Sequence, residues 1–342
     1  MRRTAITIAF FGVGATAAAG RALAERTAVI VSRVAGERPG AGLALEIEIP
    51  VPAADRVEGE ALRTLIEDRV SRTPRPPTVE QMRDMEVLAR QARSAYFNRR
   101  FAEAMEKLQR AGDILRGWVD VDSEGPDAGR ARQLFVEMRM LLGIALFRVQ
   151  HDEPRSRAML SDVVRALPNW EPTDLQYPPD MIALVRTIKT EMVERDGGTI
   201  EVELGRSGCE VYIDGNLGGI AALAGPEAAT KVVLRLVPPG DHVVYARCGS
   251  GRQRRHAIAL GVRESARMAI DPALDAALLT EPGAQPALEF ENAEAQHSDE
   301  VRMAQAIGRR IGVPRVAIVH PDGSVIQVGA LVDRPPARAA ES

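Results

Sequence analysis

Aromatic residues are scarce in this sequence, at 4% of 342 residues, so its cores must be built mainly from Ala, Leu, Val and Ile. Carbohydrate sites usually stack the sugar on exposed aromatic rings, and two tryptophans and four tyrosines supply few of these. The 44 basic and 47 acidic residues nearly cancel, leaving a formal charge of −3. Such a balance offers nucleic acid no electropositive surface, and we exclude nucleic-acid binding on that ground.

Long apolar runs are missing beyond residue 24, and the longest, Met140 to Phe147, is too short to span a bilayer. The amino terminus has the regions of a signal peptide: basic Met1-Arg2-Arg3, an apolar stretch at 4–19 and the cleavage site Ala22-Leu23-Ala24. An uncleaved anchor helix is the alternative, but the apolar stretch is short for one. We expect residues 1–24 to be removed and the mature protein to be periplasmic or secreted, without a membrane span.

Cysteine occurs only twice, at Cys209 and Cys248. An even number of cysteines in an oxidising compartment is compatible with a disulfide, whereas two buried, unpaired thiols are the alternative. A bond requires the two Cα atoms to lie within about 7 Å, which the sequence does not determine. Both interpretations therefore stay open at this point.

Residues 25–77 mix strand and helix patterns. β-branched residues predict a strand at 27–34, and alternating apolar and acidic residues predict another at 43–49. An apolar stripe predicts a helix at 55–72. The proline-rich run 73–77 then ends the region.

Helical periodicity extends from residue 78 to residue 196. Two amphipathic segments meet at the corner 98–100, which is so short that they must form an antiparallel hairpin. A second hairpin pairs 131–147 with 156–166 across a break at 151–154. Pro178-Pro179 opens a last helix, because proline is favourable at a helix start.

The first hairpin resembles a tetratricopeptide repeat, whose packing positions correspond to Leu88, Ala92, Ala104, Leu108 and Ala111. The second hairpin matches less fully, and the equivalent positions Ala104 and Met159 are 55 residues apart instead of the family's 34. The resemblance covers about residues 80–170 and implies a scaffold that binds a partner. A plain helical bundle is the alternative.

Short alternating strands replace the helical pattern over residues 197–272. The expected strands are 200–204, 209–213, 232–236, 242–248, 255–260 and 266–270. Asp214-Gly215-Asn216 predicts a tight hairpin turn. Around six short strands can bury their apolar faces only by folding into a small sandwich.

This segment resembles the PEGA domain family. The family's strand and turn correspond to Val211, Tyr212, Asp214 and Gly215, and its later Pro-Gly-x-His corresponds to Pro239, Gly240 and His242. The Pro-x-Gly-Ala run that names the family is replaced by 205–209, and 221–230 looks like an insertion. PEGA domains are attachment or interaction modules of exported bacterial proteins, so the resemblance implies a role without catalysis.

The carboxy-terminal region comprises an expected linker at 273–286, a β-α-β-β unit at 287–333 and a loose tail at 334–342. The unit has strands at 287–290, 315–320 and 325–331, a helix at 298–311, and a turn at Asp322-Gly323. It resembles half of the small α/β domain that precedes the propeller in the periplasmic Tol translocation protein. Because it is too small for a core of its own, we expect it to pack with 27–72 into one split α/β domain.

Motifs for chemistry are weak throughout. The five histidines lack metal-ligand spacing, and we expect His242 in a turn and His256 on an exposed strand instead of a zinc site. Asp120-x-Asp122-x-Glu124-Gly125 resembles an EF-hand loop, but Ala131 stands where the bidentate carboxylate is required. The sequence therefore predicts neither catalytic residues nor a metal or cofactor site.

The patterns predict a multi-domain α plus β protein with helical hairpins, a PEGA-like sandwich and a small α/β unit from the termini. We expect a non-enzymatic envelope scaffold that binds an envelope protein or a cell-surface polymer. Tyr96, Phe101 and Tyr245 are candidate contact aromatics, although a core position is commoner for each. A polysaccharide- or peptidoglycan-binding module and a divergent envelope hydrolase are the alternative functions.

Export of the full chain should yield a mature protein that begins at Glu25, because signal peptidase cleaves after a small-x-small site such as Ala22-Leu23-Ala24. The intact mass of the periplasmic or secreted form checks this expectation. A chain that keeps Met1 and sediments with membranes would contradict it.

Overall fold

The computed structural model describes residues 26–37, 49–74, 78–116, 128–167, 170–174, 176–221, 230–249 and 251–330. Its helices and strands make a mixed α plus β protein, as the sequence predicts. By its contacts the chain forms two compact units: residues 1–72 with 276–342, called here the terminal unit, and residues 73–275, called the central unit. The signal peptide, residues 43–48 of a predicted strand, and the tail lie outside the described residues.

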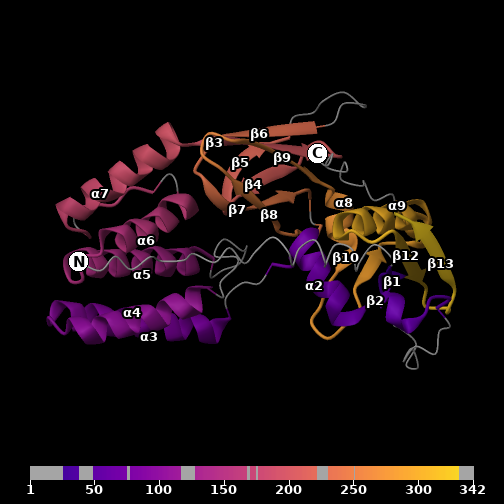
Figure 1. Ribbon diagram of the computed structural model, residues 1–342, viewed down its shortest axis with the longest axis horizontal. Coiled ribbons are helices and arrows are strands. Elements are labelled where there is room, and N and C mark those ends of the chain that lie inside the picture. Colours follow the sequence, from indigo (N-terminus) through magenta and orange to yellow (C-terminus); the bar gives the residue numbers. More distant parts are fainter. Residues whose placement is uncertain are drawn as a thin grey trace, which may run out of the picture. The chain divides into compact units, whose positions relative to one another are not determined.

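The terminal unit is built around one mixed sheet (Figure 1). Its strands are β1 (Thr27–Val34), β2 (Arg56–Val57), β10 (Leu278–Leu279), β11 (Ala287–Phe290), β12 (Arg315–Val319) and β13 (Val325–Gly329). The order is β10-β11-β1-β12-β13, with β2 beside β1. Strand β1 lies parallel to both β11 and β12, and Ile30 of β1 is in register with Ile318 of β12. This pairing of the two ends of the chain is the arrangement that a split α/β domain requires.

Helices and a loop cover the two faces of this sheet. Helix α9 (Ala293–Ile311) packs on β1, β11, β12 and β13, and α2 (Gly59–Arg69) packs on α9. On another part of the sheet, Ile49 and Val51 join Val29, Ala317 and Val319 in an apolar cluster. The terminal unit thus has the core that neither end of the chain could form alone.

Several predicted boundaries in this unit are wrong. The helix predicted at 55–72 begins only at Gly59, because Val57 pairs with Ala28 of β1 and Gly59 has a φ of +57°. The helix predicted from residue 298 begins at Ala293, where the side chain of Asn292 accepts the N–H of Ala295 at 2.9 Å.

The linker predicted at 273–286 is partly regular structure. Residues Pro272–Ala277 form the short helix α8, which strand β10 follows directly. Leu274 and Leu278 are almost completely buried, and β10 pairs with β11. Burial of these apolar side chains opposes a free linker here.

The central unit begins with two packed helix pairs. Helices α3 (Val79–Phe97) and α4 (Phe101–Arg116) form the first, α5 (Ala128–Arg148) and α6 (Glu153–Ala166) form the second, and α7 (Pro179–Lys189) follows. Their shared core is aliphatic and rich in methionine, with Met85, Leu88, Leu108, Met138 and Leu160 among its members. A core of this kind agrees with the low aromatic content.

Capping residues set the ends of these helices. Thr78 and Gln81 form a reciprocal capping box at the start of α3. Helix α6 begins at Glu153 instead of the predicted Ser156, because the side chain of Asp152 accepts the N–H of Arg155 at 3.1 Å. Among the described residues, the helices are all too short or too polar to cross a bilayer.

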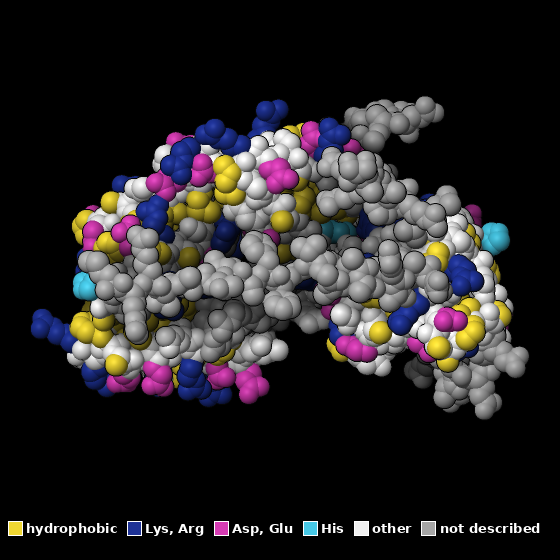
Figure 2. Space-filling view, in the orientation of Figure 1, with side chains coloured by type: hydrophobic (Ala, Val, Ile, Leu, Met, Phe, Trp, Pro, Cys, Tyr) yellow, Lys and Arg dark blue, Asp and Glu magenta, His cyan; other side chains and the backbone are white. Residues whose placement is uncertain are grey.

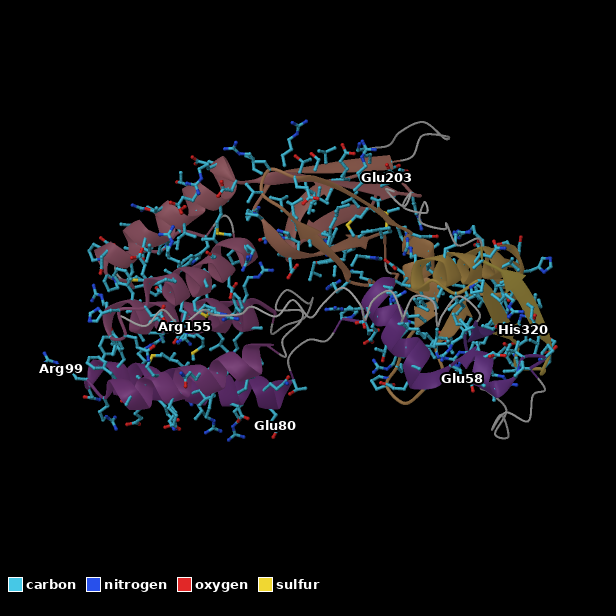
Figure 3. The ribbon with its side chains drawn as sticks, in the orientation of Figure 1. Glu58, Glu80, Arg99, Arg155, Glu203 and His320 are labelled. Atoms are coloured by element: carbon cyan, nitrogen blue, oxygen red, sulfur yellow. A yellow bond between two sulfur atoms is a disulfide. The ribbon has the colours of Figure 1, made fainter. Side chains whose placement is uncertain are left out.

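The outer faces of the helices are charged. Glu80 at the start of α3, and Arg99 at the corner after it, point outward in Figure 3. Figure 2 shows side chains of both signs alternating along this side of the helices. Such interspersed charge is typical of a solvated surface.

The rest of the central unit is two small sheets. One has the order β6-β3-β9, from β3 (Gly198–Leu204), β6 (Thr230–Val237) and β9 (Ser265–Ile270); the other has the order β5-β4-β7-β8, from β4 (Glu210–Ile213), β5 (Asn216–Ile220), β7 (Gly240–Arg247) and β8 (His256–Leu260). Val202 of β3, Val211 of β4 and Val244 of β7 belong to one hydrophobic cluster that both sheets share. The sheets therefore pack as two layers over a common core.

The helices and these sheets were predicted as separate domains, 78–196 and 197–272, but by their contacts they form one compact unit. Helix α7 continues through the π-helical turn Thr190–Arg195 into β3. The guanidinium of Arg132 in α5 donates to the carbonyl of Gly215 at 3.2 Å, and the N–H of Arg263 donates to the carbonyl of Asp196 at 3.0 Å. Hydrogen bonds thus cross the predicted boundary.

Replacing Ile318 with alanine should destabilise the terminal unit by about 2–5 kcal/mol, because this side chain is completely buried beside β1. Hydrogen exchange of the β1 amides, followed by mass spectrometry, measures the effect. The matched control is Ile326→Ala in β13, whose side chain is 38% exposed. Unchanged exchange in β1 for Ile318→Ala would show that β1 does not depend on β12.

Candidate functional site

The residues of the PEGA-like motif gather around one hydrogen-bonded pair. Asp214 and Gly215 close the β4–β5 hairpin with φ values of +47° and +76°, the geometry of a type I′ turn. The carboxylate of Asp214 lies 2.6 Å from Nδ1 of His242 and accepts the N–H of Val243 at 2.9 Å. The other ring nitrogen of His242 lies 2.6 Å from the carbonyl of Pro238. We call this pair the Asp214–His242 clamp.

The clamp is buried and charged. A carbonyl oxygen only accepts, so Nε2 of His242 donates to Pro238, and Nδ1 is left to face the Asp214 carboxylate. Burial by itself lowers the pKa of His242, but the hydrogen bond to Asp214 and the negative charge of that carboxylate outweigh it, so the pKa is raised. Through these two bonds His242 connects the turn at Asp214 to the corner at Pro238.

The other motif residues have structural contacts. Val211 is fully buried, and Tyr212 stacks on Tyr245 with ring centroids 4.8 Å apart. Pro239 lies in the corner before β7, and Gly240 opens that strand with a φ of +135°. At this φ an L side chain would be strained, and a Cβ atom at Gly240 would also displace the guanidinium of Arg165, 2.7 Å away, so the corner favours glycine.

The aromatic candidates lie in two different environments. Tyr245 is only 2% exposed and is covered by Arg255, whose guanidinium carbon lies 3.6 Å from the ring centroid. Tyr245 is therefore a core residue, the commoner position expected from the sequence, and not a contact aromatic. Tyr96 is half-buried and packs edge-on against Phe101 and Phe97, with centroids 5.6 and 6.0 Å away.

Cys209 and Cys248 form a disulfide, with their Cα atoms 4.4 Å apart. The bond joins the start of β4 to the end of β7, beside the paired residues Glu210 and Arg247. By loop-closure arithmetic, a bridge across 39 residues of chain stabilises the fold by about 4 kcal/mol. Of the two interpretations that the sequence left open, the structure has the disulfide.

His256 lies in a different environment from the predicted one. It is buried at 4% exposure instead of lying on an exposed strand, and its Nε2 lies 2.7 Å from the carboxylate of Asp275. Within the described residues, no group of three His, Cys, Asp or Glu side chains is arranged to hold a metal ion. The EF-hand-like stretch 120–125 lies outside the described residues.

A groove of about 590 Å³ runs over the helices of the central unit. Its walls come from α3, from α5 and from the segment before α7, and they include apolar residues such as Val136, Leu141 and Leu167. Trp170 and Tyr177 form an edge-on pair 5.9 Å apart at one wall, and Phe97 at another is 75% exposed. We call this the helical groove.

Charge in the helical groove is confined to a few residues. Arg93 and Glu137 form an ion pair across it, and Arg132 is a further basic group of its wall. Burial raises the pKa of Tyr177 to about 12, so its phenol is a neutral hydrogen-bond donor. The groove thus combines exposed aromatic surface with a small number of polar groups.

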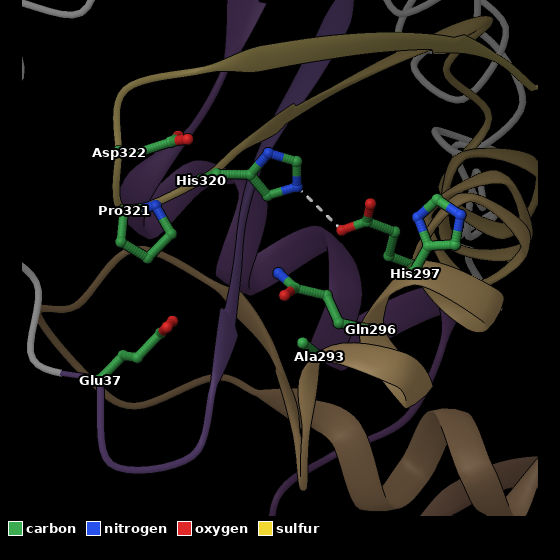
Figure 4. Close-up of a pocket in the computed structure, with 8 residues that line it drawn as sticks. Glu37, Ala293, Gln296, His297, His320, Pro321 and Asp322 are labelled. Carbon is green, nitrogen blue, oxygen red and sulfur yellow. Dashed lines mark hydrogen bonds and ion pairs between the residues drawn. The ribbon is translucent and has the colours of Figure 1, made fainter.

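A second cleft, of about 740 Å³, lies in the terminal unit where parallel strands end (Figure 4). Glu37 follows β1, Gln296 and His297 lie in the first turns of α9 after β11, and His320 follows β12. We call this the carboxyl-edge cleft, because the carboxyl ends of β1, β11 and β12 meet at the same edge of the sheet.

A buried hydrogen-bond chain forms one wall of this cleft. Glu300 of α9 is 6% exposed and accepts the hydroxyl of Ser32 at 2.7 Å, while Ser32 accepts the amide of Gln296 at 2.9 Å. Nε2 of His320 lies 2.9 Å from the same Glu300 oxygen, as the dashed line in Figure 4 shows. A carboxylate oxygen only accepts, so we assign Nε2 of His320 as a second donor to Glu300, beside the hydroxyl of Ser32.

The far side of the His320 ring contacts a turn. Its Nδ1 lies 2.9 Å from the hydroxyl of Ser324, which donates to Asp322 at 2.7 Å. That hydroxyl and the N–H of Ser324 lower the pKa of Asp322. The hydroxyl of Ser324 thus contacts both the carboxylate of Asp322 and the ring of His320.

Sequence reasoning missed the carboxyl-edge cleft entirely. Its hydrogen bonds join residues that are far apart in the sequence. Ser32 and Glu300 are 268 residues apart, and Glu300 and His320 are 20 apart, so no local motif contains them. The available signal was positional: Glu37 follows the predicted strand 27–34 and His320 ends the predicted strand 315–320, and parallel pairing of those strands would have placed them together.

Comparison with known proteins identifies no relative. No protein-family model matches the chain, and no curated protein or solved structure is significantly similar to it. Arguments about function therefore rest on the residues themselves.

The Asp214–His242 clamp should make stability depend on pH. The pKa of His242 is raised above its unfolded value of about 6.5, so the clamp stabilises the fold fully below that pH, and the contribution is lost as the pH rises through the raised pKa. In Asp214→Asn the turn geometry is retained, because asparagine tolerates positive φ. We expect the pKa of His242 to fall and the stability near pH 6 to drop by about 1.5–3 kcal/mol.

Proton NMR of the His242 ring measures its pKa. Urea unfolding at a pH below and a pH above that pKa measures the change in stability. Asp241→Asn is the matched control, because it removes an exposed carboxylate from the residue directly before His242. An unchanged His242 titration in Asp214→Asn would contradict the assignment of the clamp as a charged pair.

Proposed function

We propose that this protein is an exported, non-enzymatic scaffold of a bacterial envelope that binds a segment of another protein in its helical groove. The observation that carries the proposal is the exposed ring of Phe97 beside the Trp170–Tyr177 pair in that groove. Aromatic residues and arginine dominate the binding energy of protein interfaces, particularly where they line a pocket. Phe97 is 75% exposed and lines the same groove as Trp170 and Tyr177, so the groove offers several aromatic rings to a partner.

The chemistry of the groove favours a peptide over a polysaccharide. Its apolar wall, with Val136, Leu141 and Leu167, is complementary to an aliphatic or aromatic side chain and not to sugar hydroxyls. Arg93, Glu137 and the phenol of Tyr177 can bond to the polar backbone of a bound segment. The resemblance of α3 and α4 to a tetratricopeptide repeat points to the same class of ligand.

In this proposal the sheets of the central unit are the PEGA-like attachment or interaction module. The support is that Asp214 of the first motif half and His242 of the second bond to each other directly, which explains why the pattern contains both. The disulfide between Cys209 and Cys248 agrees with an oxidising compartment, as does the amino-terminal sequence pattern.

Site-specific crosslinking in the native cell tests the groove. A photo-reactive phenylalanine analogue at Phe97 should form a discrete protein adduct, whereas the same analogue at Val79 should not. Val79 is the matched control, because it is 78% exposed at the opposite end of α3. Binding of the purified partner should weaken about tenfold or more in Trp170→Ala, the loss of a typical aromatic anchor.

Two results would overturn the proposal. Equal adducts from Phe97 and Val79 would show that the groove has no preferred occupant. Co-sedimentation with purified sacculi that is lost in Trp170→Ala would assign the groove to a polymer and favour the polysaccharide- or peptidoglycan-binding alternative.

A further inference from the structure

The chain passes between the two units at two places. The first part of the terminal unit ends at residue 72 and its second part begins at residue 276, so the central unit runs from Thr73 to Asp275. These two exits of the central unit are more than 200 residues apart in the sequence. The sheet of the terminal unit depends on both exits, because β1 precedes the first and β11 and β12 follow the second.

One short segment at the start of β8 bonds to both exits. The guanidinium of Arg254 donates to the hydroxyl of Thr73 at 3.2 Å. Nε2 of His256 lies 2.7 Å from the carboxylate of Asp275. Arg254 and His256 are two positions apart, and in an extended chain such residues have Cα atoms about 6–7 Å apart. The two exits are therefore held close together, and we call residues 254–256 the junction segment.

The junction segment is polar and almost completely buried. Arg254 and His256 are 3% and 4% exposed, and Asp275 is 2% exposed. Removing charged groups from water costs free energy, and apolar residues of similar volume would often be at least as stable. Buried hydrogen bonds instead fix the positions of the groups that they join. The segment thus determines where the two exits lie, which apolar packing alone would not do.

Short tethers connect the exits to the terminal unit. Helix α2 ends at Arg69, shortly before Thr73, and α8 runs from Pro272 through the second exit directly into β10. Bringing the ends of a long chain together costs entropy that grows with the length of the chain. Short tethers from fixed points instead give the tethered segments a high effective concentration. The folded central unit therefore lowers the entropic cost of pairing β1 with β11 and β12.

We propose that the junction segment is a conformational device that couples the folding of the terminal unit to that of the central unit. While residues 254–256 hold Thr73 and Asp275, the two ends of the terminal unit stay together and its sheet is closed. When these bonds open, the effective concentration of the two ends falls and the sheet becomes less stable. Because the carboxyl-edge cleft forms at the edge of that sheet, the same bonds control whether the cleft is present. The coupling does not depend on the ligand of the helical groove.

Hydrogen exchange of the full mature chain, followed by mass spectrometry, tests the coupling. The double variant Thr73→Val/Asp275→Asn weakens both bonds and nearly keeps the size of the side chains. We expect its β1 and β12 amides to exchange about tenfold or more faster than in the wild type, whereas the α3 amides keep their rates. Ser156→Ala is the matched control, because it removes a buried hydrogen bond of the central unit, to the carbonyl of Gly143, that involves neither exit. Its β1 amides should exchange at the wild-type rate.

Exchange of the wild-type chain at increasing urea concentrations is a second test, and it remains decisive if the double variant does not fold. The β1 amides should lose protection at the same urea concentration as the amides of β8, the strand that begins in the junction segment. The proposal is overturned if β1 stays protected where β8 exchanges freely, or if a folded double variant keeps the wild-type rates in β1. Equal acceleration of β1 exchange by Ser156→Ala would also overturn it.

Discussion

The parallel pairing of β1 with both β11 and β12 is the interaction on which the terminal unit depends. β1 comes from one end of the chain, whereas β11 and β12, its neighbours in the strand order, come from the other, so more than 200 residues of chain must be closed into a loop. The entropic cost of that closure grows only slowly with length, and burial of Ala28, Ile30 and Ile318 offsets it. The same pairing places Glu37 and His320 at one edge, so the carboxyl-edge cleft exists only in the closed sheet.

Two cross-links, one charged and one covalent, stabilise the β-sheets of the central unit. The Asp214–His242 clamp ties the β4–β5 turn to the start of β7, and the disulfide between Cys209 and Cys248 ties the other ends of β4 and β7. The two sheets share one small apolar cluster, and burial in so small a cluster gives limited stability by itself. Covalent and charged links at opposite ends of the same strand pair compensate for that small core.

The helical groove and the carboxyl-edge cleft differ in chemistry. The helical groove is apolar and aromatic, with Phe97 and Trp170 as its anchors, and suits the side chains of a protein segment. The carboxyl-edge cleft is polar, with Glu37, Asp322 and His320 among its lining residues.

The sequence by itself determined the local elements. The periodicity of α3 and α4, the type I′ turn at Asp214-Gly215 and the strand at 27–34 depend on neighbouring residues, so a linear pattern contains them. The helix starts at Glu153 and Ala293 were not predicted. Each depends on the side chain of the preceding residue, Asp152 or Asn292, accepting a backbone N–H, which the apolar periodicity does not reveal. Tertiary structure alone decided that Cys209 meets Cys248, that His256 is buried against Asp275, and that Ser32, Glu300 and His320 form one chain. These contacts join residues that share no local pattern, because only the pairing of distant strands brings their side chains within hydrogen-bonding distance.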